Sequence, residues 1–287
     1  MITEQFYQFP SPAKLNLFLH VVGRRANGYH ELETVFQFLN YGDCIEIKVT
    51  PAPYINLLTP ITGVNNDDNL IIKAAKLLQH KANCTLGAEI KINKVLPMGG
   101  GLGGGSSNAA TVLMALNTLW DVNLSINSLA DIGLSLGADV PIFIHGFSAF
   151  AQGVGEKLTP YSPDEYWYLV SKPRCHISTI DVFNDEDLPR NTPKLSTNKI
   201  NIEQCHNDCQ TVVIKRYPEV AKLLSWLIEY APSRMTGTGA CVFSHFNSEQ
   251  EALNLQEKLP KGIESFVAKG VNQSPLLTAI NAVKTTK

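Results

Sequence analysis

The sequence lacks any apolar run long enough to cross a bilayer, which takes about 18 residues. Residues 1–5 also lack the charged and apolar regions of a signal peptide. Both absences argue against a membrane-spanning or exported protein. We therefore expect a cytoplasmic location.

An excess of charge of one sign is missing as well. The formal net charge is −2 at pH 7, and the lysines and arginines are scattered along the chain. Proteins that bind nucleic acid commonly carry a basic patch that complements the phosphate backbone. We therefore expect neither nucleic acid nor a membrane as a partner.

Cysteine is sparse, with six residues spread through the chain. This spacing is typical of reduced thiols and not of a disulfide framework. The segment Cys205-His206-Asn207-Asp208-Cys209 gathers residue types that bind metals, but no second ligand pair follows at zinc spacing. Ordinary residues flanking a helix are the favoured interpretation there.

The length and composition predict two domains. The chain has 287 residues, more than one core usually spans, and its 44% of hydrophobic residues can fill two cores. Residues 159–164 are typical of a linker, so we place the boundary near residue 155, between domains of residues 1–155 and 156–287. The order of predicted elements indicates an α+β fold of two layered domains with a cleft between them.

The hydrophobic pattern predicts the individual elements. Strands are predicted at 13–22, 34–39, 44–49, 89–95, 140–144, 167–170, 240–246 and 265–269. Helices are predicted at 70–80, 109–120, 129–136, 208–216, 219–230 and 248–259.

Six glycines and two serines stand in residues 97–108, between a predicted strand and a predicted helix. Glycines let several backbone N–H groups turn toward one point, because no Cβ is in the way. The first turn of the following helix adds partial positive charge. The segment therefore predicts an anion cradle that binds phosphate.

Other interpretations of this loop are weaker. Gly99 to Gly104 satisfies G-x-G-x-x-G, but a dinucleotide site needs an acid that closes a second strand about 20 residues later, and Asp121 lies in a connecting segment. A P-loop needs lysine where Ser106 stands. A glycine-rich turn without a ligand is the remaining alternative, and Ser106 could also serve as a helix N-cap.

Lys14 and Asn16 share one face of an otherwise apolar strand, because side chains alternate along a strand. Burying an ammonium costs several kcal/mol unless the charge is paired. A lysine on the inner face therefore needs a carboxylate or a bound anion. An outward, solvated pair is equally compatible with this segment alone.

Two further segments are compatible with a ligand. Asp139 lies between Gly137, which ends a predicted helix, and a predicted strand, and a turn or N-cap aspartate is favoured from this segment alone. Residues 235–240 form a second turn of small residues, where the backbone could approach a ligand. A simple tight turn is equally allowed there.

Together, three of these segments resemble the signature motifs of the GHMP kinases, which include galactokinase and the homoserine, mevalonate and phosphomevalonate kinases. They are Pro12-Ala13-Lys14-Leu15-Asn16, the loop at residues 96–107 and Thr236-Gly237-Thr238-Gly239. Residues 23–30, 137–141 and 188–193 further resemble the members that act on a CDP-linked methylerythritol in the non-mevalonate route to isoprenoids. The resemblance runs from about Pro10 to Pro275.

This resemblance implies a two-domain GHMP kinase fold with the active site in the cleft between the domains. The implied reaction is an ATP-dependent phosphorylation of the 2-hydroxyl of the CDP-linked methylerythritol, with Mg²⁺ accompanying ATP. Such a transfer depends mostly on positioning and charge neutralisation. The oligomeric state stays open.

The matched motifs also imply residue roles. Asp139 would be the general base, and Lys14 would hold it ionised and counter the charge on the transferred group. The residues expected to bind the substrate are Asn16, Tyr29, His30, Thr179 and Phe183. The residues expected to bind ATP are Asn69, Lys94, Pro97, Met98, Gly99, Gly100, Gly101, Leu102, Gly103, Gly104, Gly105, Ser106 and Ser107.

Some of these assignments have simpler alternatives. Asn69 also suits a helix N-cap, and Lys94 a solvated strand end. Ser106 or Ser107 could reach Mg²⁺, whose other ligands the sequence leaves unknown.

Three other functions are weighed against this one: a homoserine or mevalonate type of kinase, a nucleotide-binding protein without catalysis, and a dinucleotide-dependent oxidoreductase. The presence of both Lys14 and Asp139 argues against a protein without catalysis. Tyr29, His30 and Phe183 favour a cytidine over small acids, because flat rings stack on a flat base.

Overall fold

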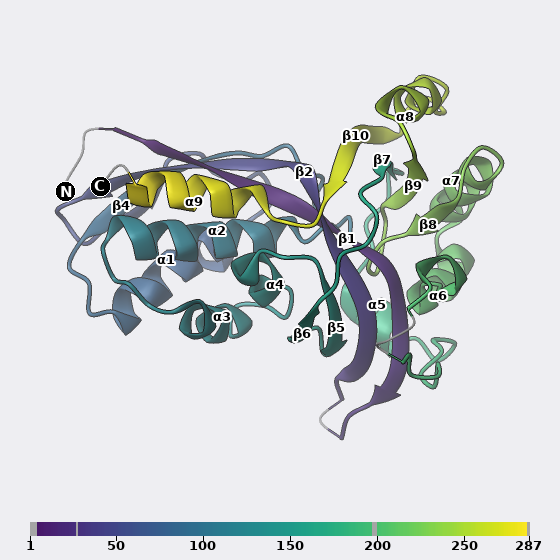
Figure 1. Cartoon of the computed structure of the whole chain (residues 1–287), viewed down its shortest axis with the longest axis horizontal. Coiled ribbons are helices and arrows are strands. Elements are labelled where there is room, and N and C mark those ends of the chain that lie inside the picture. The colour runs from purple at the N-terminus through teal and green to yellow at the C-terminus, as the bar shows by residue number, and fades with distance from the viewer. Residues whose placement is uncertain (1–4, 27, 197–199, 286–287) are drawn as a thin grey trace.

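The computed structural model describes residues 5–26, 28–196 and 200–285. Two long antiparallel strands, β1 (Tyr7–Arg24) and β2 (His30–Thr50), run through both halves of the molecule (Figure 1). The sequence predicts β2 as two short strands, whereas the structure has one continuous strand. Asn27, in the segment that joins β1 to β2, lies outside the described residues.

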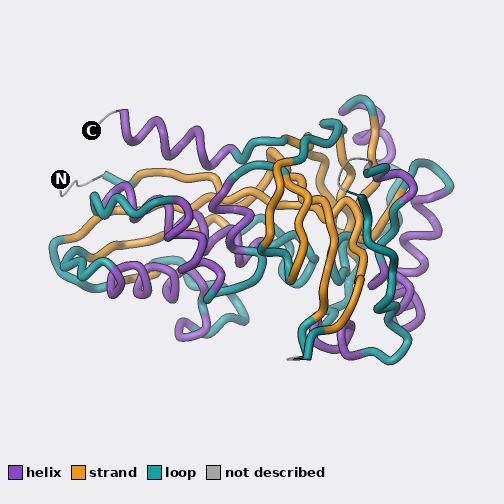
Figure 2. Tube along the Cα trace, turned by 60° about the horizontal axis from the view of Figure 1, so that its bottom comes forward, coloured by secondary structure: helices purple, strands orange, loops and turns teal. Residues whose placement is uncertain are grey.

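The described strands form one ten-stranded sheet. It lies between two groups of helices, as Figure 2 shows. Its strands lie in the order β3 (Ile55–Leu57), β4 (Gly87–Asn93), β2, β10 (Glu264–Val271), β7 (Trp167–Lys172), β9 (Val242–Phe246) and β8 (Ser233–Met235). Off this path, β1 pairs with β2, and β5 (Ala149–Gly153) pairs with both β2 and β6 (Lys157–Pro160).

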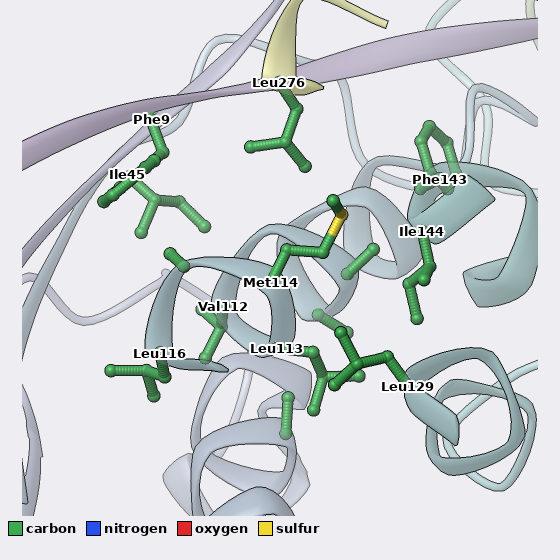
Figure 3. Close-up of a cluster of buried hydrophobic side chains, with 14 of the residues drawn as sticks. Phe9, Ile45, Val112, Leu113, Met114, Leu116, Leu129, Phe143, Ile144 and Leu276 are labelled. Carbon is green, nitrogen blue, oxygen red and sulfur yellow. The ribbon is translucent and has the colours of Figure 1, made fainter. Parts of the chain in front are cut away.

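One group of helices covers the first half of β1 and the second half of β2, which pair with each other. It contains α1 (Leu70–Lys81), α2 (Gly104–Leu119), α3 (Ile126–Leu134), α4 (Val140–His145) and the last helix, α9 (Pro275–Thr285). Figure 3 shows a cluster of buried side chains on both sides of α2: Leu113 lies beside Leu129 of α3, whereas Phe9, Ile45 and Leu276 lie on the opposite side of the helix. Burying a leucine or phenylalanine side chain contributes about 1.5–3 kcal/mol, so this cluster holds α2, and the loop before it, firmly in place.

The second group of helices packs on the sheet formed by β7, β8, β9 and β10 (Figure 1). It contains α5 (Thr179–Asn184), α6 (Asp208–Arg216), α7 (Pro218–Ile228) and α8 (Glu249–Gln256). Its core is a second cluster, in which Leu223 and Leu227 of α7 meet Leu169 and Val242 of the sheet. The α+β prediction is confirmed.

Several predicted elements are confirmed, and some are wrong. The helices predicted at 70–80 and 208–216 match α1 and α6. Residues 140–144 form helix α4 and not a strand, because Pro141 in the first turn suits a helix start and because every side chain there is buried, which hides the helical period. The helices α5 and α9 were not predicted.

The boundary near residue 155 stays a prediction. It falls between β5 and β6, which pair with each other. In addition, α9 from the end of the chain contacts β1 and α2, and its Leu276 and Ile280 lie in the first hydrophobic cluster. The packing therefore crosses a purely linear division of the chain.

None of the described helices is long and apolar enough to pass through a membrane. The cytoplasmic location stays a prediction.

Candidate active site

The ammonium group of Lys14 lies inside the molecule, where three oxygen atoms surround it. Its side chain is only 3% exposed, and its Nζ lies 3.2 Å from Asp139 Oδ2. The same Nζ donates hydrogen bonds to Asn16 Oδ1 at 2.6 Å and to the Gly101 carbonyl at 3.1 Å. The inward orientation of Lys14 and Asn16 is thus correct, and the outward, solvated alternative is wrong.

Asp139 directly precedes α4, at its N-cap position. Its side chain makes no capping hydrogen bond, and it points instead toward Lys14 while staying 35% exposed. Asp139 thus has the expected turn and N-cap position, but its side chain does not cap the helix. A carboxylate that is paired with an ammonium on one side and open to a cavity on the other is available to a ligand.

Asn16 is fixed by contacts on both sides. Its Nδ2 donates to Thr34 Oγ1 at 3.0 Å, and its backbone N–H donates to Thr236 Oγ1 at 2.8 Å. These bonds leave Asn16 Oδ1 directed at Lys14. The second turn of small residues, at 235–240, thus contacts the strand that carries Lys14 through Thr236.

The glycine loop at residues 99–103 enters α2 through an N-cap glycine. Gly103 has φ 71°, so the helix begins at Gly104 and Ser106 is not its cap. Gly99 and Gly101 also have positive φ. A Cβ on Gly101 would lie 2.4 Å from the Thr236 carbonyl oxygen, so only glycine fits.

The two glycine-containing turns lie side by side. Ala240 N–H donates to the Gly99 carbonyl at 3.3 Å, and Cys241 N–H donates to the Gly100 carbonyl at 3.2 Å. The backbone N–H of Lys14 donates to the Leu102 carbonyl at 3.0 Å. All three motif segments of the sequence therefore meet at one place.

Two cavities adjoin the glycine loop. The first has a volume of 330 Å³ and is lined by Lys14, Asp139, Thr179, Phe183 and Thr238, which come from both halves of the chain. The second has a volume of 380 Å³ and is lined by Asn69, Lys94 and the loop from Pro97 to Ser106. Gly99, Gly101, Gly103 and Ser106 line both cavities. The loop therefore lies between the two cavities.

Asn69 serves two purposes in the second cavity. Its Oδ1 accepts a hydrogen bond from Ile71 N–H at 2.9 Å, so it does cap α1. Its Nδ2 is buried with no partner in the described structure. A buried donor without an acceptor costs about 1–3 kcal/mol, and this cost is removed when a ligand accepts the hydrogen bond.

Asp43 lies behind the wall of this cavity, where it contacts Lys94, and the sequence analysis missed it. Its side chain is fully buried, and its Oδ2 lies 2.7 Å from Lys94 Nζ, so Lys94 is not a solvated strand end. The carboxylate also accepts from Val95 N–H, Leu96 N–H and Asn108 Nδ2 at 2.8–2.9 Å. It thereby fixes the entry to the glycine loop. A lone aspartate within a strand carries no pattern that marks this role.

The two serines of the loop lie in different surroundings. Ser107 is buried, and its Oγ accepts a hydrogen bond from Ser11 Oγ at 2.9 Å, away from both cavities. Ser106 lines both cavities. Of the two, Ser106 is therefore the one placed to meet a cation, and hydroxyl and carboxylate oxygens are the hard ligands that Mg²⁺ prefers.

The remaining residues expected at the substrate site gather around α5 and the turn after β1. His30 stacks on Phe183 with ring centroids 5.1 Å apart and an interplanar angle of 23°. Thr179 Oγ1 lies 2.9 Å from Thr238 Oγ1. Tyr29 is 62% exposed and, like His30, is not part of the wall of the first cavity. Burial, with the guanidinium groups of Arg190 and Arg24, lowers the pKa of His30.

Residues 205–209, which gather residue types that bind metals, make other contacts in the structure. His206 Nε2 lies 2.8 Å from Asp208 Oδ1, and the other oxygen of Asp208 accepts from Val21 N–H and Thr192 Oγ1. Among the residues the structure describes, no group of three or more histidine, cysteine or acidic side chains is arranged to hold a metal ion.

Known proteins are similar to this chain over nearly its whole length. Residues 69–147 match the GHMP kinases N terminal domain, and residues 187–264 match the GHMP kinases C terminal domain. A 4-diphosphocytidyl-2-C-methyl-D-erythritol kinase of Colwellia psychrerythraea is 66% identical over 95% of this chain and 93% of its own. This chain belongs to that kinase family.

Further relatives and solved structures support membership of the 4-diphosphocytidyl-2-C-methyl-D-erythritol kinase family. The Shewanella pealeana kinase of this name is 60% identical over 94% of this chain and 95% of its own. A crystal structure of a 4-(cytidine 5'-diphospho)-2C-methyl-D-erythritol kinase matches with a TM-score of 0.81, 28% identity, and coverage of 92% and 98% of the two chains. The Methanococcus jannaschii mevalonate kinase, at 16% identity and a TM-score of 0.67, shares the fold. The predicted two-domain GHMP kinase fold is confirmed, and this chain is a small-molecule kinase.

Proposed function

We propose that this kinase transfers a phosphoryl group from ATP to the 2-hydroxyl of 4-(cytidine 5'-diphospho)-2-C-methyl-D-erythritol. The observation that carries the proposal is the pair Lys14 and Asp139, 3.2 Å apart at the wall of the first cavity and beside the glycine loop. The relatives named for this substrate, at 58–66% identity, support the choice of acceptor.

Asp139 acts as the general base in this proposal. Its exposed oxygen accepts the proton of the attacking hydroxyl, a role that contributes about 10²- to 10⁴-fold to a rate. Lys14 stabilises the negative charge of Asp139 and offsets the charge that develops on the transferred group. Because Asn16 and Gly101 supply neutral acceptors, Asp139 is the only counter-charge within ion-pair distance of Lys14 among the described residues.

The second cavity holds ATP in this proposal. The first turn of α2 directs its unpaired N–H groups at the phosphates, and the glycines permit their close approach. The unpartnered Nδ2 of Asn69 and the ammonium of Lys94 are placed to contact the adenine end. Mg²⁺ bound with ATP would supply charge neutralisation, and Ser106, which lines both cavities, would be an oxygen donor that helps to hold it.

The cytidine end of the acceptor lies against α5 in this proposal. Phe183 and Tyr29 stack on the cytosine ring, and His30 contacts its polar edge. Thr179 and Asn16 line the path between the cytidine and Asp139. Tyr29 is 62% exposed and lies outside the wall of the first cavity, so its role rests on the family resemblance.

The test is ADP release from ATP and Mg²⁺, with the CDP-linked methylerythritol, homoserine and mevalonate as separate acceptors. We expect turnover with the first alone. Turnover with homoserine or mevalonate in its place would overturn the proposed acceptor.

Asp139→Asn tests the base. We expect a loss of turnover of about 10²-fold or more, with calorimetric affinity for the CDP-linked acceptor close to that of the unaltered protein. Asp131→Asn, at an exposed acid of the preceding helix, is the matched control and keeps full turnover. Unchanged turnover in Asp139→Asn removes Asp139 from the mechanism.

A further inference from the structure

Arg190 lies between the two segments expected to bind cytosine, and the proposed function gives it no role. It follows α5 in the segment at residues 188–193. Its Nε donates to His30 Nε2 at 3.1 Å. Its Nη2 donates to the Phe183 carbonyl at 3.1 Å and to the Asp185 carbonyl at 2.6 Å. One guanidinium therefore contacts both members of the stacked pair, His30 through its ring and Phe183 through its backbone.

The contact with His30 determines where the imidazole carries its proton. A guanidinium has donors and no acceptor, so His30 Nε2 must accept through its lone pair. A neutral imidazole protonated on one nitrogen then has its proton on Nδ1. The charged groups that face His30 are the guanidiniums of Arg190 and Arg24, and both, together with burial, oppose a second proton.

The contacts with α5 fix Phe183 in the same way. The carbonyls of Phe183 and Asp185 lie at the C-terminal end of α5, where carbonyls have no partner within the helix. A cation at this end is favourable because the helix dipole is negative there. Arg190 Nη1 also donates to the Leu188 carbonyl at 3.1 Å, which holds the guanidinium itself in place.

We propose that Arg190 is a positioning residue for base recognition, which holds His30 as its Nδ1–H tautomer and Phe183 against it so that the site selects cytosine over uracil. The inference rests on the proposed function. N3 of cytosine is an acceptor that an Nδ1–H donor can meet. N3 of uracil carries a hydrogen, which an N–H donor repels.

The first experiment measures specificity in Arg190→Met. Steady-state kinetics are compared for the CDP-linked acceptor and for the same acceptor carrying uridine in place of cytidine. We expect the KM for the CDP-linked acceptor to rise about tenfold or more, and the preference over the uridine version to fall by a similar factor, as for a lost hydrogen bond to a charged group. The KM for ATP should stay within about twofold, since Arg190 is not in the wall of the ATP cavity.

The second experiment reads the tautomer directly. Nitrogen-15 NMR of histidine-labelled protein reports which ring nitrogen of His30 carries the proton, and a purely structural role would leave it unchanged. We expect the Nδ1–H form in the unaltered protein and a mixture of forms in Arg190→Met. Calorimetry with CMP gives the affinity for the nucleotide without any turnover.

Two variants complete the design. Lys215→Met removes a cation that pairs with Asp187 in the same region, 2.9 Å away and exposed, and should leave the tautomer and both KM values unchanged. Arg190→Lys keeps the charge at the end of α5 but loses the planar fork, so it serves if Arg190→Met fails to fold. It should melt near the unaltered protein and still raise the KM for the CDP-linked acceptor more than that for ATP.

The outcomes separate this inference from the proposed function. If the unaltered protein fails to phosphorylate the CDP-linked acceptor, the proposed function is wrong, while the NMR and CMP measurements still test Arg190. The inference is overturned if His30 keeps its Nδ1–H form in Arg190→Met. It is also overturned if the KM for ATP rises as much as that for the CDP-linked acceptor.

Discussion

Replacing Gly101 by alanine tests whether the two glycine-containing turns must touch. Gly101 has φ 77°, and an added Cβ would lie 2.4 Å from the backbone carbonyl oxygen of Thr236. Real Cβ contacts are essentially never shorter than 3.0 Å, so the turns would have to separate by at least about 0.6 Å, the difference between these values. A backbone atom cannot rotate away as a flexible side chain can.

The expected cost combines two effects. A left-handed backbone costs a residue with a Cβ about 1–2 kcal/mol, and overpacking against a fixed neighbour costs about 1–3 kcal/mol. We therefore expect Gly101→Ala to lower the free energy of unfolding by about 2–5 kcal/mol. The separation also breaks the hydrogen bond from Lys14 Nζ to the Gly101 carbonyl, so turnover should fall and the KM for ATP should rise about tenfold.

The assay is urea unfolding, followed by ADP-release kinetics at varied ATP. Gly105→Ala is the matched control for the urea unfolding, because Gly105 lies within α2 and an added Cβ would meet only Leu70 Cδ1, at an ordinary 3.5 Å. Alanine within a helix is more stable than glycine by about 0.5–1 kcal/mol, so the control should unfold at the same or higher urea. If Gly101→Ala unfolds like the control and keeps its KM for ATP, the close approach of the turns is not required.

Three further changes probe other parts of the site. Phe183→Ala should weaken binding of the CDP-linked acceptor by about 1–3 kcal/mol in calorimetry if the ring stacks on the base, and an unchanged affinity would mean that it only packs on His30. Asp43→Asn should destabilise the protein by about 3 kcal/mol and raise the KM for ATP, because it leaves Lys94 without its buried partner. The control Asp67→Asn changes an exposed acid nearby and should have neither effect. Lowering the pH below about 6.5 should destabilise the protein in urea titrations, because the unfolded chain then binds more protons than the folded one, and a constant midpoint would contradict this. The histidines responsible have pKa values lowered chiefly by burial, and they are His20, His30, His145 and His245.

Local patterns were sufficient to predict the parts of the site that depend on one segment. Alternation along β1 places Lys14 and Asn16 on one face, and the glycines of residues 99–105 indicate a loop before a helix. The pairing of Lys14 with Asp139 depends on segments far apart in the chain, and only the family resemblance anticipated it. Asp43 had no signal of either kind.

There are physical reasons why the sequence did not reveal some of the helices. Helix α5 has six residues, too few to show a period, and α4 is apolar on every side. Helix α9 does carry a helical signal, because Leu276 and Ile280 lie four residues apart and both are buried. Its place on the first half of the molecule could not be read from the sequence, since it follows β10 and the elements of the second half.

The backbone of β1 shows why the site forms where it does. Its ladder with β2 is interrupted between Pro12 and Lys14 and again between Asn16 and Leu19. Between these interruptions, the N–H groups of Lys14 and Asn16 donate to the Leu102 carbonyl and to Thr236 Oγ1, one from each glycine-containing turn. An unpaired strand edge would otherwise leave these donors free to pair with another chain. The two turns thus satisfy the free edge of β1, and in doing so they are held against the strand face that carries the ammonium.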